Sequence, residues 1–110
     1  MGYLMYDGRD YEFEDRLLAH LKVAVGKKFR RHESFFLNWT VGASHGSGRV
    51  SLWMDPSQHV GFRFSGSREP ELNKTWVRAL VELSTTHRGL IAMSERQAET
   101  YMSEKESAKA

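Results

Sequence analysis

The sequence contains no cysteine and only two prolines among its 110 residues. The absence of cysteine excludes a disulfide framework, a cysteine-ligated zinc or iron–sulfur site and a thiol nucleophile. No apolar stretch approaches the roughly 18 residues that indicate a membrane helix. Residues 1–10 carry neither the basic segment nor the apolar segment of a signal peptide. We therefore expect a cytoplasmic protein without a membrane-spanning helix.

The chain has the length of one domain, and its charge is nearly balanced. At 110 residues it can bury a single hydrophobic core without disulfides or a structural metal. Its 16 Lys and Arg residues and 14 Asp and Glu residues leave a formal net charge of +2. This total is too small to indicate a partner, so the distribution of charge along the chain matters more.

Positive charge is concentrated in residues 16–32, which include six Lys or Arg residues and no acidic residue. The spacing of the apolar residues predicts a helix here. Asp15 is a good N-cap before Arg16, although Glu14 leaves the exact start of the helix open. At about 100° per residue, leucines gather on one face of this helix and most of the cations on the other. The cationic face consists of Arg16, His20, Lys27, Arg30 and Arg31. Basic residues near the end of a helix also complement its dipole, so the charge alone does not assign a function.

A hairpin is predicted at the start of the chain. Residues 2–6 and 11–14 have the composition of short strands, and they flank the dipeptide Asp7-Gly8. Both residues of this dipeptide tolerate the positive φ that a two-residue turn between antiparallel strands requires.

Three further strands are predicted after the basic helix, because apolar and polar residues alternate there. The three runs are separated by turn residues and cover residues 34–41, 50–54 and 60–64. Consecutive runs of this kind favour a meander. We expect its outward face to carry Phe36, Trp53 and Arg63, which is more aromatic than a solvated face usually is.

A second helix is predicted to begin at Pro70 and to end before Gly89, with a short strand at residues 90–93. The resulting order, β-β-α-β-β-β-α-β, predicts an α+β fold in which two helices pack on one mostly antiparallel sheet. Residues 1–93 are expected to form this single domain. Residues 94–110 are rich in Glu, Lys, Ser and Ala, which predicts a polar tail that is mobile or forms a frayed helix.

Three motifs resemble a known family. They are Arg30-Arg31-His32-Glu33-Ser34-Phe35, then Gly46-Ser47-Gly48-Arg49 with Trp53 soon after, and Asn73-Lys74-Thr75-Trp76-Val77-Arg78-Ala79-Leu80. With these motifs the chain is similar, over residues 2–94, to a family of short actinobacterial proteins of unknown function. Some members of that family carry the automatic label ATP-dependent DNA ligase. The resemblance implies a fold and a compartment, and it implies no established activity.

The ligase label does not agree with the residues of this chain. Ligase-type nucleotidyl transfer needs a lysine in Lys-x-Asp-Gly, because an amine must attack the α-phosphate and form a phosphoramidate. Here Met5 stands at the position of that lysine, two residues before Asp7-Gly8, and its side chain cannot attack. We therefore expect no ligase chemistry.

The cationic helix face supports a first hypothesis, a small cytosolic module that binds nucleic acid. Lys and Arg side chains gain affinity for a phosphate backbone by releasing its condensed counterions. Exposed aromatic side chains beside them would add stacking on bases. The candidate contact residues are Arg16, His20, Lys27, Arg30, Arg31 and Arg63.

The same features leave a second hypothesis open, a non-enzymatic module for protein interaction or self-association. A charged helix face is commonly only solvated, whereas an aromatic sheet face or an unpaired strand edge can receive another protein chain. This hypothesis predicts a stable oligomer and no steep dependence of DNA binding on salt.

The remaining motifs indicate no catalytic, cofactor or metal site. The five histidines lie far apart and lack the close His and carboxylate spacing of a metal site. Residues 42–49 are rich in glycine, but a phosphate-binding loop leads into a helix through Gly-Lys-Ser/Thr, and this segment joins two predicted strands. We therefore expect no cofactor and no metal, and the sequence indicates no enzymatic reaction.

Overall fold

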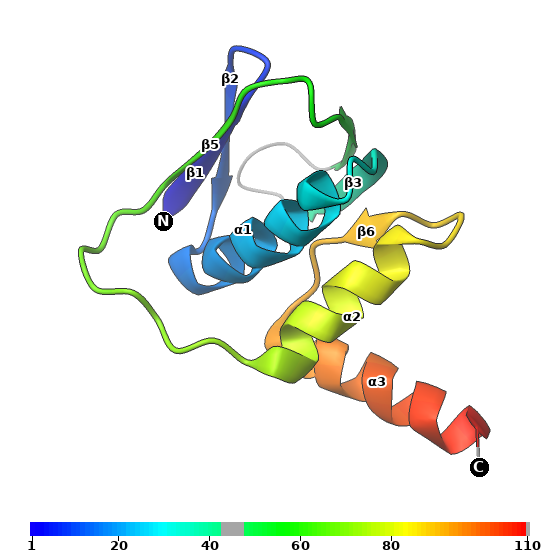
Figure 1. Ribbon diagram of the computed structural model, residues 1–110. Coiled ribbons are helices and arrows are strands. Elements are labelled where there is room, and N and C mark those ends of the chain that lie inside the picture. Colours follow the sequence, from blue (N-terminus) through cyan, green and yellow to red (C-terminus); the bar gives the residue numbers. More distant parts are fainter. Residues whose placement is uncertain (43–47, 110) are drawn as a thin grey trace.

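The computed structural model describes residues 1–42 and 48–109, which form six strands and three helices (Figure 1). The first sheet has the order β2–β1–β5 and consists of β1 (Gly2–Tyr6), β2 (Arg9–Phe13) and β5 (Val60–Arg63). The second has the order β4–β3–β6 and consists of β3 (Phe35–Val41), β4 (Gly48–Met54) and β6 (Leu90–Ile91). The helices are α1 (Asp15–Arg30), α2 (Lys74–Ser84) and α3 (Glu95–Lys109). Residues 43–47, the centre of the glycine-rich loop, lie outside the described residues.

The predicted α+β class is confirmed, and the order of elements through β6 agrees with the prediction. The predicted number of two helices is wrong, because residues 95–109 form α3. Apolar and polar contacts together dock this mostly polar helix. Ala98 and Met102, one helical turn apart, are buried in the core, and Lys105 forms an ion pair with Glu82 of α2.

The prediction of one sheet with a three-strand meander is wrong. β5 leaves β4 and pairs antiparallel with β1, so that Arg63 lies opposite Tyr3. β6 pairs with β3 in parallel, with Leu90 opposite Leu37. Alternation in a sequence determines which side chains face the core, but it does not determine which strands become neighbours.

The predicted hairpin at Asp7-Gly8 is confirmed. Asp7 has a φ of 51° and Gly8 a φ of 77°, and Tyr6 pairs with Arg9 across the turn. Both central residues are therefore left-handed, as the tightest hairpin turn requires.

The cap of α1 differs from the prediction. Glu14 is the N-cap, and its carboxylate accepts a hydrogen bond from the backbone N–H of Arg16 at 3.3 Å. Asp15 instead holds the loop after β5, because its carboxylate accepts from the backbone N–H groups of Gly66 at 3.0 Å and Ser65 at 3.3 Å. These bonds, that from Gly66 first, lower the pKa of Asp15.

The C-terminal end of α1 is closed by the backbone. The N–H of Glu33 donates to the carbonyl of Lys28 at 3.1 Å, and the N–H of His32 donates to that of Phe29 at 3.0 Å. His32 has a φ of 57°, the left-handed conformation that this double hydrogen-bond motif needs. The helix therefore ends at Arg30, two residues before the predicted end.

The predicted start of α2 at Pro70 is wrong, because the helix begins at Lys74. Asn73 is its N-cap, and the side-chain oxygen of Asn73 accepts from the backbone N–H groups of Thr75 at 2.9 Å and Trp76 at 3.3 Å. A side-chain oxygen in this place satisfies N–H groups that have no partner within the helix, which proline cannot do.

The two sheets meet at two aromatic side chains. The hydroxyl of Tyr6 donates to the carbonyl of Trp53 at 2.9 Å and accepts from the N–H of Asp55 at 2.9 Å. The Trp39 ring lies edge-on to Phe13, with 4.9 Å between ring centroids. Helices cover the inward face of β4–β3–β6, where α2 packs on β6 and β3 and lies between α1 and α3 (Figure 1).

Candidate functional site

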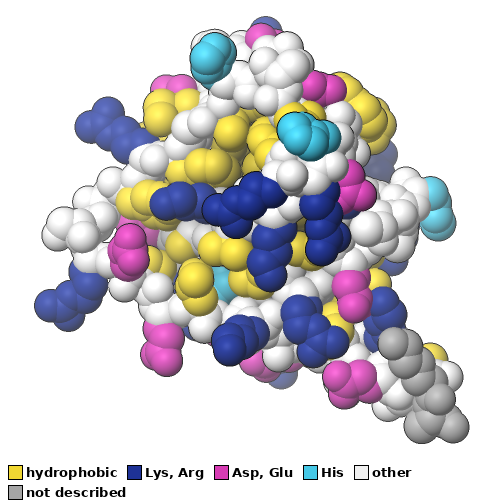
Figure 2. All heavy atoms as spheres, viewed as in Figure 1, with side chains coloured by type: hydrophobic (Ala, Val, Ile, Leu, Met, Phe, Trp, Pro, Cys, Tyr) yellow, Lys and Arg dark blue, Asp and Glu magenta, His cyan; other side chains and the backbone are white. Residues whose placement is uncertain are grey.

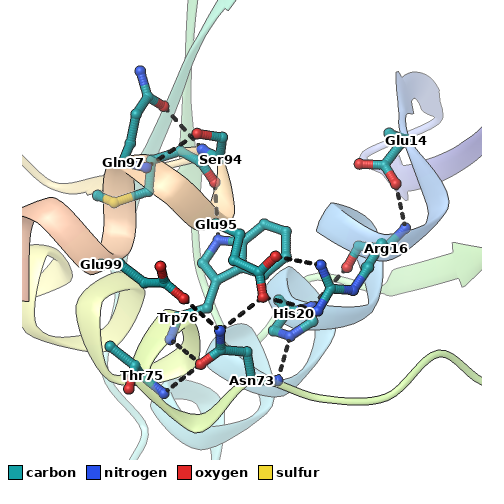
Figure 3. Close-up of polar contacts among 11 residues, drawn as sticks. Glu14, Arg16, His20, Asn73, Thr75, Trp76, Ser94, Glu95, Gln97 and Glu99 are labelled. Carbon is teal, nitrogen blue, oxygen red and sulfur yellow. Dashed lines mark hydrogen bonds and ion pairs between the residues drawn. The ribbon is translucent and has the colours of Figure 1, made fainter.

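The first part of the cationic face of α1 is turned towards the other helices. Arg16 binds Glu95 of α3 in a two-pronged ion pair, with nitrogen–oxygen distances of 2.6 and 2.8 Å (Figure 3). Its guanidinium carbon also lies 5.3 Å from the centroid of the Trp76 ring. Both terminal nitrogens of the guanidinium bind the carboxylate, so Arg16 connects α1 to α3.

His20 is fully buried between α1 and α2. Its Nδ1 donates to the carbonyl of Arg16 at 2.7 Å, and its Nε2 accepts from the backbone N–H of Asn73 at 2.8 Å. A carbonyl can only accept and an amide N–H can only donate, so the imidazole is neutral with its proton on Nδ1. Burial lowers the pKa of His20, and the ring stacks on Trp76 with 4.1 Å between centroids.

Asn73 and Glu95 complete this cluster, which we call the helix junction: Arg16, His20, Asn73, Trp76 and Glu95 (Figure 3). The side-chain nitrogen of Asn73 donates to Glu95 at 2.7 Å. Hydrogen bonds from Arg16 and then from Asn73 lower the pKa of Glu95 to about 2. The junction holds the three helices together and is a structural centre.

The sequence-based reading missed Asn73 and Glu95. The N-cap role of Asn73 could have been predicted, because asparagine is a preferred N-cap residue and Asn73 stands just before the apolar helical pattern that begins at Trp76. Glu95 had no such signal, because its partner Arg16 is 79 residues away in the sequence.

Solvent-exposed cations gather elsewhere on the helical layer. Lys27 and Arg30 are exposed on α1, and Arg31 is exposed at its C-cap. Lys22 is also exposed, with its ammonium 5.9 Å from the centroid of the Phe64 ring. On α2, Lys74 and Arg78 are exposed one helical turn apart. We call this set the basic face: Lys22, Lys27, Arg30, Arg31, Lys74 and Arg78.

Figure 2 shows Lys and Arg side chains over both α1 and α2 in a single view. Lys28 is not part of the basic face, because it is buried and its ammonium lies 3.3 Å from a carboxylate oxygen of Glu33. The structure thus keeps Lys27, Arg30 and Arg31 of the predicted cationic face together in solvent, and it adds cations from α2.

Arg63 lies apart from this surface. It is exposed on β5, opposite Tyr3 of β1, which is also exposed. The neighbouring Leu4 and Phe62 of the same pairing point inward, so Arg63 and Tyr3 lie on the outward face of β2–β1–β5. The expected group of Phe36, Trp53 and Arg63 therefore does not form.

Phe36 and Trp53 do form a pair on the outward face of the other sheet. They stand opposite each other on β3 and β4, with ring centroids 4.9 Å apart and ring planes 66° apart. Phe36 is 49% exposed and Trp53 is 53% exposed. A groove of about 680 Å³ begins at the next outward pair along these strands, Asn38 and Ser51. Its lining includes Arg49 and Arg88 and extends past β6 to Gln97 of α3.

The described residues contain no group of three or more His, Asp or Glu residues placed to hold a metal ion. None of the helices in residues 1–42 and 48–109 is both long and apolar enough to cross a membrane.

The class that these features define is a small α+β domain in which the described residues form three packed helices and two three-stranded sheets, one antiparallel and one mixed. A family model with the description "Domain of unknown function (DUF7882)" matches residues 1–95. The chain therefore belongs to this family, in agreement with the resemblance to proteins of unknown function. The matched region ends where α3 begins. No curated protein and no solved structure matches the chain significantly.

The buried imidazole makes stability depend on pH. The pKa of His20 in the folded protein is below its ordinary value of 6.5, so the unfolded chain binds a proton first as the pH falls. Stability is therefore full above about pH 6.5 and decreases below it. The low pKa of Glu95 adds a second loss between its ordinary value of 4.5 and about 2.

We expect His20→Gln to flatten the pH dependence between pH 7 and pH 5, because glutamine can accept from Asn73 and does not titrate. Urea unfolding at several pH values measures this. His59→Gln removes an exposed histidine and should leave the slope unchanged. An equal slope in His20→Gln and the wild type would contradict the assignment.

Proposed function

We propose that the chain is a small cytoplasmic module that binds nucleic acid through the basic face. The supporting observation is a cluster of exposed cations on two packed helices. In the described part of the chain, no carboxylate forms an ion pair with any of the six. Free cations of this kind release condensed counterions when they bind a phosphate backbone.

The proposed contact is to the sugar–phosphate backbone and carries no base specificity. His20 is excluded from it by burial, and Arg16 by its ion pair with Glu95. Ligase chemistry forms no part of the proposal, since Met5 stands in place of the nucleophilic lysine on the exposed side of β1.

Salt dependence provides the quantitative test. With about four to six cations on duplex phosphates, log affinity should fall against log salt with a slope of roughly −3.5 to −5.5. Fluorescence anisotropy of a labelled random-sequence duplex at several salt concentrations measures this slope. Arg30→Gln/Arg31→Gln should weaken binding and reduce the slope by about 1.8, because each phosphate contact contributes about 0.9. Neutral glutamine is used because an acidic residue would oppose the helix dipole at this end of α1.

A matched control is Arg9→Gln/Arg63→Gln, which removes the same charge from exposed positions on the β2–β1–β5 sheet, away from the basic face. This variant should retain the slope of the wild type within experimental error. Equal losses in the two double variants would mean that only net charge matters, which contradicts a defined basic face. Absence of duplex binding by the wild type at low salt would also contradict it.

Self-association is the second candidate, and exposed apolar side chains favour it. Tyr3 and Met5 lie on the outward face of β1, 40% and 37% exposed. A module of this kind would sediment as a stable oligomer and would show no salt-steep duplex binding. The same titration, combined with sedimentation, separates the two candidates.

A further inference from the structure

We propose that the outward face of the β4–β3–β6 sheet is a separate site that takes a short stretch of single-stranded nucleic acid. The helical layer and this face lie on opposite sides of the sheet, since α2 packs on β3 and β6 while Phe36 and Trp53 point into solvent. The site consists of an aromatic platform, Phe36 and Trp53, and the groove beside it, which contains Arg49 and Arg88.

The platform is exposed and firmly supported. Both residues are about half exposed to solvent, and adjacent exposed apolar side chains of this size can mark a binding surface. The carbonyl of Trp53 accepts a hydrogen bond from Tyr6 at 2.9 Å, which ties the backbone beneath the platform to the other sheet. Because every base has a π-face, such a platform stacks on bases without selecting a sequence.

The groove continues from the platform along β3 and β4. The pairs Asn38–Ser51 and Thr40–Arg49 follow the aromatic pair, each about 7 Å further along the strands. Hydrogen bonds hold the side chains of Asn38 and Ser51 in place. The hydroxyl of Ser51 donates to the side-chain oxygen of Asn38, and the Asn38 nitrogen donates to the carbonyl of Arg88 at 3.0 Å.

The turn before β6 lies directly beside the platform. A Cβ built on Gly89 would stand 3.2 Å from the Cβ of Phe36, so the residue before it, Arg88, adjoins the aromatic pair. The platform and the arginine-containing groove therefore form one continuous surface from β4 to β6.

The charge of the groove favours an anion. Among the described residues that line it, Arg49 and Arg88 are charged and none is Asp or Glu. Asp55, just after β4, does not line the groove, and its carboxylate accepts hydrogen bonds from Ser57 and from Ser34 at 2.8 Å. A ligand that alternates flat bases with phosphates complements an aromatic platform beside a cationic groove. A duplex keeps its bases stacked inside, so the site selects a single strand.

The test measures anisotropy of labelled oligothymidylate, together with quenching of tryptophan fluorescence. Trp53→Ala should weaken binding about 5- to 150-fold, the effect of losing one base–aromatic stack. Trp53→Phe should retain most of the affinity and lose most of the quenching. Arg49→Gln/Arg88→Gln should reduce the salt slope by about 1.4, because a single-strand phosphate contributes about 0.7.

Two controls isolate the stacking contribution. Tyr3→Ala removes an exposed aromatic side chain from the outward face of the other sheet, and it should leave the affinity for oligothymidylate unchanged. An abasic strand of the same length should bind the wild type weakly, and Trp53→Ala should weaken it no further. The arginine double variant tests the site independently if Trp53→Ala fails to fold.

The outcomes distinguish this site from the basic face. Unchanged single-strand binding in folded Trp53→Ala and in Arg49→Gln/Arg88→Gln overturns the site, whatever happens to duplex binding. Duplex binding should respond to Arg30→Gln/Arg31→Gln and not to Trp53→Ala. The proposal is wrong if oligothymidylate does not bind the wild type. If, in addition, the wild type sediments as an oligomer and Trp53→Ala as a monomer, the outward face of β4–β3–β6 is a protein interface.

Discussion

Trp76→Ala is expected to destabilise the protein by about 3–5 kcal/mol, the usual cost of removing a buried tryptophan side chain. Trp76 is 2% exposed, and its indole N–H donates to the carbonyl of Met93 at 2.9 Å. The variant also removes the ring on which His20 stacks. Since small domains are stable by about 5–15 kcal/mol in total, we expect a large shift of the urea midpoint, measured by circular dichroism.

Trp53→Ala is the matched control for this prediction, because it deletes the same side chain at an exposed position. Its expected effect on stability is about 1 kcal/mol, the contribution of the edge-on contact with Phe36. A loss in Trp76→Ala no greater than that in Trp53→Ala would show that the helix junction does not hold the helical layer together.

Gly89→Ala is expected to destabilise the protein by about 2–5 kcal/mol, because backbone strain and steric overlap act together. Gly89 has a φ of 75°, a conformation that side chains rarely adopt. A Cβ there would also stand 2.9 Å from the backbone oxygen of Phe36 and 2.8 Å from the side-chain nitrogen of Asn38. Thermal unfolding measures the loss.

Gly26→Ala makes the same chemical change in the opposite setting. Gly26 lies inside α1, and a Cβ there would meet no atom within 4 Å. Alanine favours the helix more than glycine, so this variant should stabilise the protein by about 0.5–1 kcal/mol. Stabilisation by both variants would contradict the described close approach of β6 to β3.

The proposed nucleic-acid contact and the helix junction involve different cations of the same helix. The helical periodicity placed Arg16 and Arg30 on the same cationic face, at about 100° per residue, and so predicted the same exposure for both. The structure separates them: Arg16 binds Glu95, whereas Arg30 is exposed. We therefore expect mutations at the start of α1 to change stability. Mutations at its end are expected to change duplex binding if the proposed function is correct, and the titrations above separate the two effects.

Two local features of the fold, the first hairpin and the outward aromatic pair, were readable from the sequence because their causes lie within a few residues. The dipeptide Asp7-Gly8 predicted its hairpin through the φ preferences of the two residues. Alternation of apolar and polar residues placed Phe36 and Trp53 on an outward sheet face, where the structure also has them.

What only the tertiary structure decided involves partners that are distant in the sequence. His20 has the charge pattern of a surface residue, and it is buried because Trp76 and the N–H of Asn73 lie against it. β5 alternates like a meander strand, yet β1 is its neighbour. Periodicity along a chain specifies which face a side chain takes, whereas the packing of distant elements specifies what that face meets. The sequence by itself thus determined the α+β class, the order of the elements through β6 and the basic segment, and tertiary packing selected the cations that remain in solvent.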